Sequence, residues 1–283
     1  SMSRLQLITK DARQSGRKLL IPYLVAGDPS KVVTIDIMHE LVKKGADILE
    51  LGIPFSDPSS DGEIIQKSVE RSLKKGTSLQ DTLDIVAEFR KLNQQTPVVL
   101  MGYLNPVEIM GPDNFVRKAK EVGVDGVLMV DMPPAEAEVI HQMLKDSNID
   151  SIFLVAPTTR EGRVKTILKM TSGYVYYVSL KGVTGASITD DQEVERNVSA
   201  LRASTELPIV VGFGVKDGSS ARRMSRASDG VIVGSALVKN IARLSTQNSI
   251  DKDDIEDCTA IIGLIRKELD SDNASNSSFK EHE

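Results

Sequence analysis

The sequence predicts an α/β fold: a closed (β/α)8 TIM barrel with extra helices, formed by a single domain. Short apolar, β-branched runs recur along the chain, and amphipathic helical patterns separate them. Eight such strand-and-helix units fit a closed barrel better than an open sheet. A chain of 283 residues is also long enough to bury one large core.

The predicted strands have the length and composition of buried parallel strands. They span residues 19–26, 46–51, 97–101, 126–130, 151–155, 174–178, 208–211 and 230–233. Amphipathic helical patterns lie between or after them at residues 31–44, 79–92, 114–121, 135–145, 160–170, 191–203, 218–226, from 236 onward, and at 254–269. The long insert after the second strand has room for an extra helix at residues 63–75. We expect residues 1–269 to form the domain and the polar residues 270–283 to be a flexible tail.

Composition narrows the function classes. The net charge of -5 gives no polycationic field for nucleic acid, and aromatic residues make up only 4%. The longest apolar runs are strand-sized, so we expect no membrane span, and the start Ser1-Met2-Ser3-Arg4 lacks the pattern of a signal peptide. The single Cys258 leaves no internal disulfide, which is consistent with a cytoplasmic protein.

Two acids stand out near the second predicted strand. Glu50 lies within an otherwise apolar run, and Asp61 follows in a loop rich in Pro and Ser. Because side chains alternate along a strand, Leu49 and Leu51 would face the helices and Glu50 the barrel interior, close to the carboxyl end where such barrels build active sites. Loss of solvent there favours the neutral carboxyl, which suits a general acid. The alternative is a strand-end glutamate paired with a basic neighbour.

Glycine-containing turns follow the last two predicted strands. Gly212 and Gly214 follow the seventh, and Gly234 and Ser235 follow the eighth, each before a helix. Small residues let a ligand approach the backbone, and the unpaired N–H groups of a helix start favour an anion. We therefore expect a phosphate site here, to which Gly185 could add a donor. The alternative is that these glycines only permit tight turns.

Other polar residues support weaker hypotheses. Tyr103 and Tyr176 could reach the barrel mouth, and Asp131 could either cap the following helix or contact a ligand. The three histidines are scattered and there is one cysteine, so we expect no transition-metal site. No Ser-His-Asp constellation is evident, and no GxGxxG follows the first strand.

Together these motifs closely resemble one family, the alpha subunit of tryptophan synthase. The matching segments run in the family's order through residues 19–239: Pro22-Tyr23, Gly27-Asp28-Pro29, Leu49 to Pro58 with Asp61-Gly62, Tyr103 with Asn105-Pro106, Val130 to Pro134, Ala156 to Thr159, Gly182 to Ala186, Val211 to Gly214, and Val233 to Val238.

The resemblance implies a lyase of tryptophan biosynthesis. It would cleave indole-3-glycerol phosphate to indole and glyceraldehyde 3-phosphate, with Glu50 as acid and base and Asp61 holding the indole N–H. Thr184 matches the threonine of the family's lid. The phosphate would be held by Gly185, Gly212, Gly214, Gly234 and Ser235, and the substrate pocket would include Tyr23, Tyr103 and Tyr176.

The resemblance also implies a partner, a beta subunit that receives indole in an alpha2beta2 heterotetramer. Pyridoxal phosphate would belong to that partner, and no cofactor is expected in this chain. Ser59, Ser60 and Glu63 depart from the family's usual Leu-Ala and proline, next to the loop that docks on the partner. Two rival hypotheses remain: another phosphate-handling barrel enzyme, such as an isomerase or aldolase, and a non-catalytic subunit that only activates the beta chain.

Overall fold

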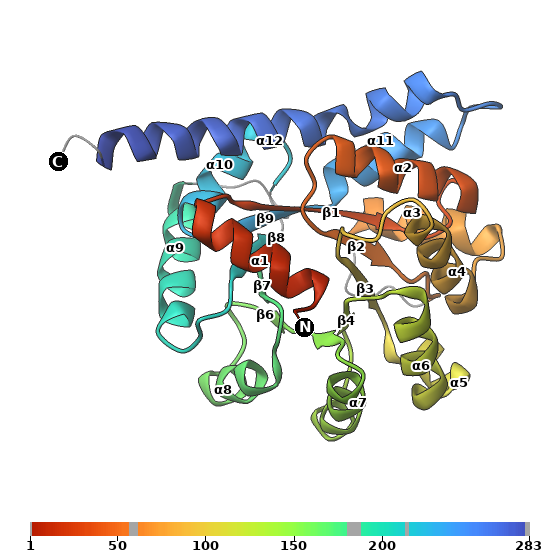
Figure 1. Cartoon of the computed structure of the whole chain (residues 1–283), viewed down its shortest axis with the longest axis horizontal. Coiled ribbons are helices and arrows are strands. Elements are labelled where there is room, and N and C mark those ends of the chain that lie inside the picture. The colour runs from red at the N-terminus through yellow and green to blue at the C-terminus, as the bar shows by residue number, and fades with distance from the viewer. Residues whose placement is uncertain (1, 57–61, 180–187, 213–214, 281–283) are drawn as a thin grey trace.

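The strands form a parallel sheet that curls into a barrel, with helices around its outside (Figure 1). The computed structural model describes residues 2–56, 62–179, 188–212 and 215–280. The strands within these ranges are β1 (Leu19–Val25), β2 (Leu49–Gly52), β3 (Val98–Gly102), β4 (Gly126–Met129), β5 (Asp150–Ser151), β6 (Leu154–Val155), β7 (Val175–Val178), β8 (Ile209–Gly212) and β9 (Gly230–Val233).

The helices over the same ranges mostly follow the predicted pattern. They are α1 (Arg4–Ser15), α2 (Lys31–Lys43), α3 (Glu63–Lys74), α4 (Leu79–Arg90), α5 (Leu104–Met110), α6 (Pro112–Val122), α7 (Pro134–Asp146), α8 (Glu161–Met170), α9 (Ile188–Arg202), α10 (Gly218–Arg226), α11 (Ser235–Leu244) and α12 (Lys252–Lys280). The extra helix predicted after the second strand is α3. Within the described ranges, no helix has both the length and the apolar character needed to cross a membrane.

The barrel closes through its fifth strand, which is interrupted. The order of strands is β5-β4-β3-β2-β1-β9-β8-β7-β6, so two segments adjacent in the chain lie at its two ends. Asp150–Ser151 pairs with β4, and Leu154–Val155 pairs with β7. Between them, the Ile152 N–H still donates to β4 while the Phe153 carbonyl accepts from β7. The predicted strand 151–155 therefore changes partner midway, and the predicted (β/α)8 barrel is confirmed.

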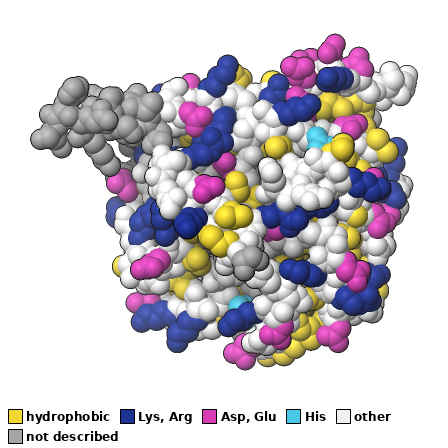
Figure 2. All heavy atoms as spheres, in the orientation of Figure 1, with side chains coloured by type: hydrophobic (Ala, Val, Ile, Leu, Met, Phe, Trp, Pro, Cys, Tyr) yellow, Lys and Arg dark blue, Asp and Glu magenta, His cyan; other side chains and the backbone are white. Residues whose placement is uncertain are grey.

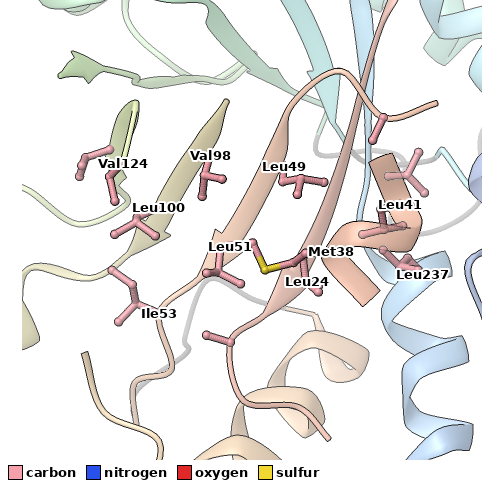
Figure 3. Packing of buried hydrophobic residues seen from close by; sticks show 14 of the residues in the cluster. Leu24, Met38, Leu41, Leu49, Leu51, Ile53, Val98, Leu100, Val124 and Leu237 are labelled. Atoms are coloured by element: carbon pink, nitrogen blue, oxygen red, sulfur yellow. The ribbon is translucent and has the colours of Figure 1, made fainter. Parts of the chain in front are cut away.

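Alternating side chains divide the core into two clusters. Leu49 and Leu51 belong to the cluster between the sheet and the helices, whereas Ile48 belongs to the cluster inside the barrel. In Figure 3, Leu49 and Leu51 leave the same face of β2, and Leu51 is directed toward Met38 of α2. The predicted alternation along this strand is confirmed, and it sends the side chain of residue 50 into the lumen.

Helix α1, which the sequence analysis did not predict, covers the amino-terminal end of the barrel (Figure 1). Its first turn is held by a capping box between Ser3 and Gln6. Leu5 is fully buried and joins the cluster inside the barrel. The end opposite the expected active site is thus filled by side chains of a helix. In Figure 2, this face of the molecule carries Lys and Arg side chains interspersed with Asp and Glu.

Aspartates at the amino-terminal ends of strands tie neighbouring strands together. The carboxylates of Asp47, Asp125 and Asp229 accept the backbone N–H groups of residues 20, 98 and 209 over 2.8, 2.9 and 2.8 Å. Two of them also hold buried arginines: Arg266 lies 2.9 Å from Asp47, and Arg90 lies 2.7 Å from Asp125. These contacts fix the strand register that places the lumen residues.

Helices α5 and α12 also differ from the sequence prediction. Helix α5 begins directly after Tyr103, in a segment where no helix was predicted; Pro106 is tolerated because it lies in the first turn. Helix α12 runs on to Lys280 rather than ending at residue 269, because residues 270–280 contain no glycine or proline to stop it. It packs against α2, α10 and α11.

Candidate active site

Glu50 lies inside the barrel, beside the cross-strand neighbours Tyr23 of β1 and Val99 of β3. Its side chain has no exposed surface. The structure does not support the alternative of pairing with a basic neighbour, because the carboxylate instead accepts a hydrogen bond from the phenol of Tyr174. The Tyr174 hydroxyl donates to Oε2 over 2.8 Å, and Oε1 makes no hydrogen bond within the described residues.

The surroundings of Glu50 favour its protonated form. Burial raises the pKa of this carboxyl to about 8, and the hydrogen bond from Tyr174 opposes part of that rise. Burial, followed by the charge of Glu50, raises the pKa of Tyr174 well above its ordinary value, so the phenol remains a donor. A carboxyl that is neutral near pH 7 and keeps one oxygen unengaged can give a proton to a substrate.

Tyr174 is a site residue that the sequence analysis missed. It immediately precedes β7 and is fully buried within the inner cluster, as is most of Tyr176. The signal was present in the alternation: residues 174, 176 and 178 share one face of a strand, so the lumen position of Tyr176 implies that of Tyr174. The partner relationship to Glu50 was not available from sequence, because it spans 124 residues.

Two tyrosines lean over glycines of neighbouring strands. A Cβ atom at Gly52 would come within 2.4 Å of the Tyr23 hydroxyl, and one at Gly212 within 2.6 Å of the Tyr176 hydroxyl. Real Cβ atoms essentially never come this close to another atom. A side chain at either glycine would therefore overlap the neighbouring phenol. Tyr23 and Tyr176 therefore both lie in the lumen, and their contact with a substrate stays a prediction.

Tyr103 lies at the carboxyl end of β3, where it is the N-cap of α5 and is largely buried. Its ring packs against that of Phe55, with 5.5 Å between the centroids. Asp131 does not cap the helix that follows it. Its carboxylate instead accepts the backbone N–H of Leu104 over 2.8 Å, which ties the end of β4 to the start of α5.

Gly234 and Ser235 form the start of α11, as N-cap and first helical residue. The Val238 N–H donates to the Gly234 carbonyl, so the N–H groups of the three residues between them have no acceptor within the helix. Unpaired N–H groups at a helix start favour an anion, together with the helix dipole, and these groups lie at the carboxyl end of β9. Gly212 ends the adjacent β8.

Four predicted site residues, Asp61, Thr184, Gly185 and Gly214, lie outside the described residues. The other predicted site residues all lie inside the barrel or at the carboxyl ends of its strands. They are Glu50, Tyr23, Tyr103, Tyr176, Gly212, Gly234 and Ser235. Over those same described ranges, no three His, Cys, Asp or Glu side chains gather where they could hold a metal ion.

Comparison with known proteins gives a consistent result. Residues 9–262 match the model of the family described as tryptophan synthase alpha chain. The chain is 50% identical to the tryptophan synthase alpha chain of Marinobacter nauticus over 95% of this chain and 99% of the relative. It is also 50% identical to that of Methylococcus capsulatus, over 95% of this chain and 100% of the relative.

Solved structures agree with the sequence relatives. Tryptophan synthase subunit alpha from Legionella pneumophila superposes with a TM-score of 0.88 at 38% identity, over 96% of this chain and all of that one. A ligand-free tryptophan synthase chain from M. tuberculosis superposes with a TM-score of 0.83 at 30% identity, over 95% of this chain and 99% of that one. This chain therefore belongs to the tryptophan synthase alpha chain family.

Proposed function

We propose that this chain is the lyase subunit that cleaves indole-3-glycerol phosphate to indole and glyceraldehyde 3-phosphate, and that Glu50 transfers the protons. The observation that carries this proposal is the buried Glu50 carboxyl, which is protonated near pH 7 and keeps Oε1 free of other hydrogen bonds among the described residues. The substrate is inferred from the membership of this chain in the tryptophan synthase alpha chain family.

The reaction needs a proton at the indole carbon that leaves. Glu50 gives its proton to C3 of the indole ring, which makes the ring an electrophile. The resulting carboxylate then removes the proton of the hydroxyl on the adjacent glycerol carbon. The O–H electron pair forms the aldehyde C=O, the C–C bond breaks, and its electrons restore the aromatic ring. Glu50 ends protonated, so one residue serves as acid and as base.

The remaining predicted residues complete this proposal. Asp61 would hold the indole N–H and stabilise the positive charge that grows on the ring. The phosphate would bind the N–H groups at the start of α11, with Gly185, Gly212 and Gly214 giving close access to the backbone. Thr184 would bond the Asp61 loop when the site excludes water. Tyr23, Tyr103 and Tyr176 would bound the pocket.

Indole then passes to the beta subunit of the heterotetramer, which carries the pyridoxal phosphate. This chain itself needs no cofactor for the proposed steps, because the acid, the base and the anion site are protein groups. We further propose a cytoplasmic location, which is supported by the single cysteine, Cys258, held as a buried free thiol.

The test is release of indole and glyceraldehyde 3-phosphate from indole-3-glycerol phosphate, with and without a beta subunit. We expect slow release by the chain alone, faster release with the partner, and none above background for Glu50→Gln. Glu88→Gln, an exposed glutamate of α4, is the matched control and should retain full activity. No release by the unmodified chain with the partner present would refute the proposal.

Asp61→Asn tests the second acid. We expect kcat to fall by roughly 100-fold or more, as for the loss of a group that stabilises transition-state charge. A fall of less than about threefold would remove Asp61 from the mechanism. A chain that releases no indole but speeds the partner's own reaction would instead be a purely regulatory subunit.

A further inference from the structure

The Tyr23 side chain lies between the two halves of the candidate site. Its backbone is the cross-strand neighbour of Glu50, and its side chain is half-buried against the inner cluster. The ring continues past Glu50 toward the carboxyl end of β2. This is shown by Gly52, the next inward position on that strand, where a Cβ atom would meet the Tyr23 hydroxyl at 2.4 Å.

The base of the same ring faces the proposed anion site. A Cβ atom at Gly234 would lie 3.8 Å from Tyr23 Cδ1 and 3.9 Å from Tyr23 Cβ, which is ordinary contact distance. Tyr23 therefore extends from the turn that begins α11 to the end of β2. The turn carries the proposed phosphate donors, and the proposed acid, Glu50, lies two residues before the end of β2.

The substrate must cross the same interval. Between its reacting indole carbon and its phosphate lies a three-carbon chain with two hydroxyl groups. One hydroxyl is on the carbon bonded to indole and gives its proton to Glu50. The other is on the middle carbon and takes no part in the proton transfers. It needs a polar partner, because an unpaired hydroxyl is costly in a site without solvent.

We propose that the Tyr23 hydroxyl hydrogen-bonds the middle hydroxyl of the glycerol chain, which makes Tyr23 a specificity-determining residue for hydroxylated substrates. This inference rests on the proposed function and deepens it. Gly52 is part of this arrangement, because any side chain at this position would displace the phenol of Tyr23. Its backbone has no positive φ angle, so the requirement at this position is one of space.

The test compares two ligands in Tyr23→Phe with the beta subunit present. We expect kcat/KM for indole-3-glycerol phosphate to fall about 3- to 10-fold, as for one lost hydrogen bond. The Kd of 3-indolylpropyl phosphate, which lacks both hydroxyls, should stay within about twofold, because it makes no such bond. Tyr177→Phe is the matched control: this buried tyrosine of β7 faces outward and accepts a hydrogen bond from Asn197 of α9.

Equal losses for both ligands would overturn the inference, since they would mean that Tyr23 only shapes the pocket. Unchanged kinetics would overturn it as well. Gly52→Ala is the second variant: it should impair indole-3-glycerol phosphate more than the deoxy ligand, and combining it with Tyr23→Phe should give less than the product of the two effects. Indole release by the unmodified chain reports on the proposed function separately, so the two failures are distinguishable.

Discussion

Tyr174 and Glu50 meet across the lumen from opposite walls of the barrel. The phenol, next to β7, donates to Oε2 of the carboxyl on β2 over 2.8 Å, and the two strands lie half a turn apart in the strand order. The hydrogen bond orients the carboxyl and lowers its pKa, because a donor stabilises the ionised form. Burial raises the pKa of Glu50, and this is the larger of the two effects.

Tyr174→Phe should therefore raise the pKa of Glu50 above its present value of about 8. Loss of the donor leaves burial unopposed, so the carboxyl keeps its proton to higher pH. We expect the alkaline limb of the pH profile of kcat/KM for indole release to move to higher pH. Tyr177→Phe should leave the profile in place, and a downward shift in Tyr174→Phe would contradict the assignment.

Glu50→Gln should remove a pH dependence of stability. The folded-state pKa of about 8 lies above the ordinary 4.5, so the folded chain binds this proton more tightly than the unfolded chain. The resulting stabilisation is complete below about pH 4.5 and is lost as pH rises through about 8. Relative to the variant, the unmodified chain should lose stability across this window. Urea unfolding at several pH values measures the free energy of unfolding of both proteins. If the two free energies changed with pH in parallel, a buried, titrating Glu50 would be refuted.

Asp125→Ala should destabilise the fold by about 3–5 kcal/mol. The substitution leaves Arg90 buried without its carboxylate and removes the acceptor of the Val98 N–H. Arg90 remains charged at neutral pH, because burial lowers its pKa only to about 10. Urea unfolding measures the loss. Glu88→Ala, which breaks the exposed pair with Lys91, is the control and should cost less than about 1 kcal/mol.

Leu5→Ala should cost about 2–5 kcal/mol, because it opens a cavity where α1 fills the end of the barrel. Leu7 lies on the same helix but is 47% exposed, so Leu7→Ala should change stability by no more than about 0.5 kcal/mol. Thermal or urea unfolding of the pair distinguishes the two sites. Equal effects would mean that α1 does not seal the barrel.

The fold was largely predictable because parallel buried strands carry a strong local pattern. Each expected strand position is occupied, and the inward direction of Glu50 followed from the apolar residues beside it. Helix α1 was missed because its burial depends on contacts with strands far along the chain. Helix α5 was missed because its 7 residues are too few to show an apolar pattern over several turns.

The candidate site was predictable where chemistry is unusual for its position. An acid in an apolar strand and glycines at strand ends are visible in sequence, and they identified Glu50, Gly212 and Gly234. Tyr174 was not identified, because a tyrosine in an apolar strand resembles ordinary core until its partner is known. The change of partner within the fifth strand depends on barrel closure, which no local pattern records.

The interrupted fifth strand joins the two walls of the barrel that carry Glu50 and Tyr174. At Ile152 and Phe153 its hydrogen bonds pass from β4 to β7, so the barrel stays closed through this strand. Glu50 belongs to the wall formed by β1 to β5, and Tyr174 precedes β7 in the other wall. The hydrogen bond between them is therefore a second connection between the two walls, made by side chains inside the lumen.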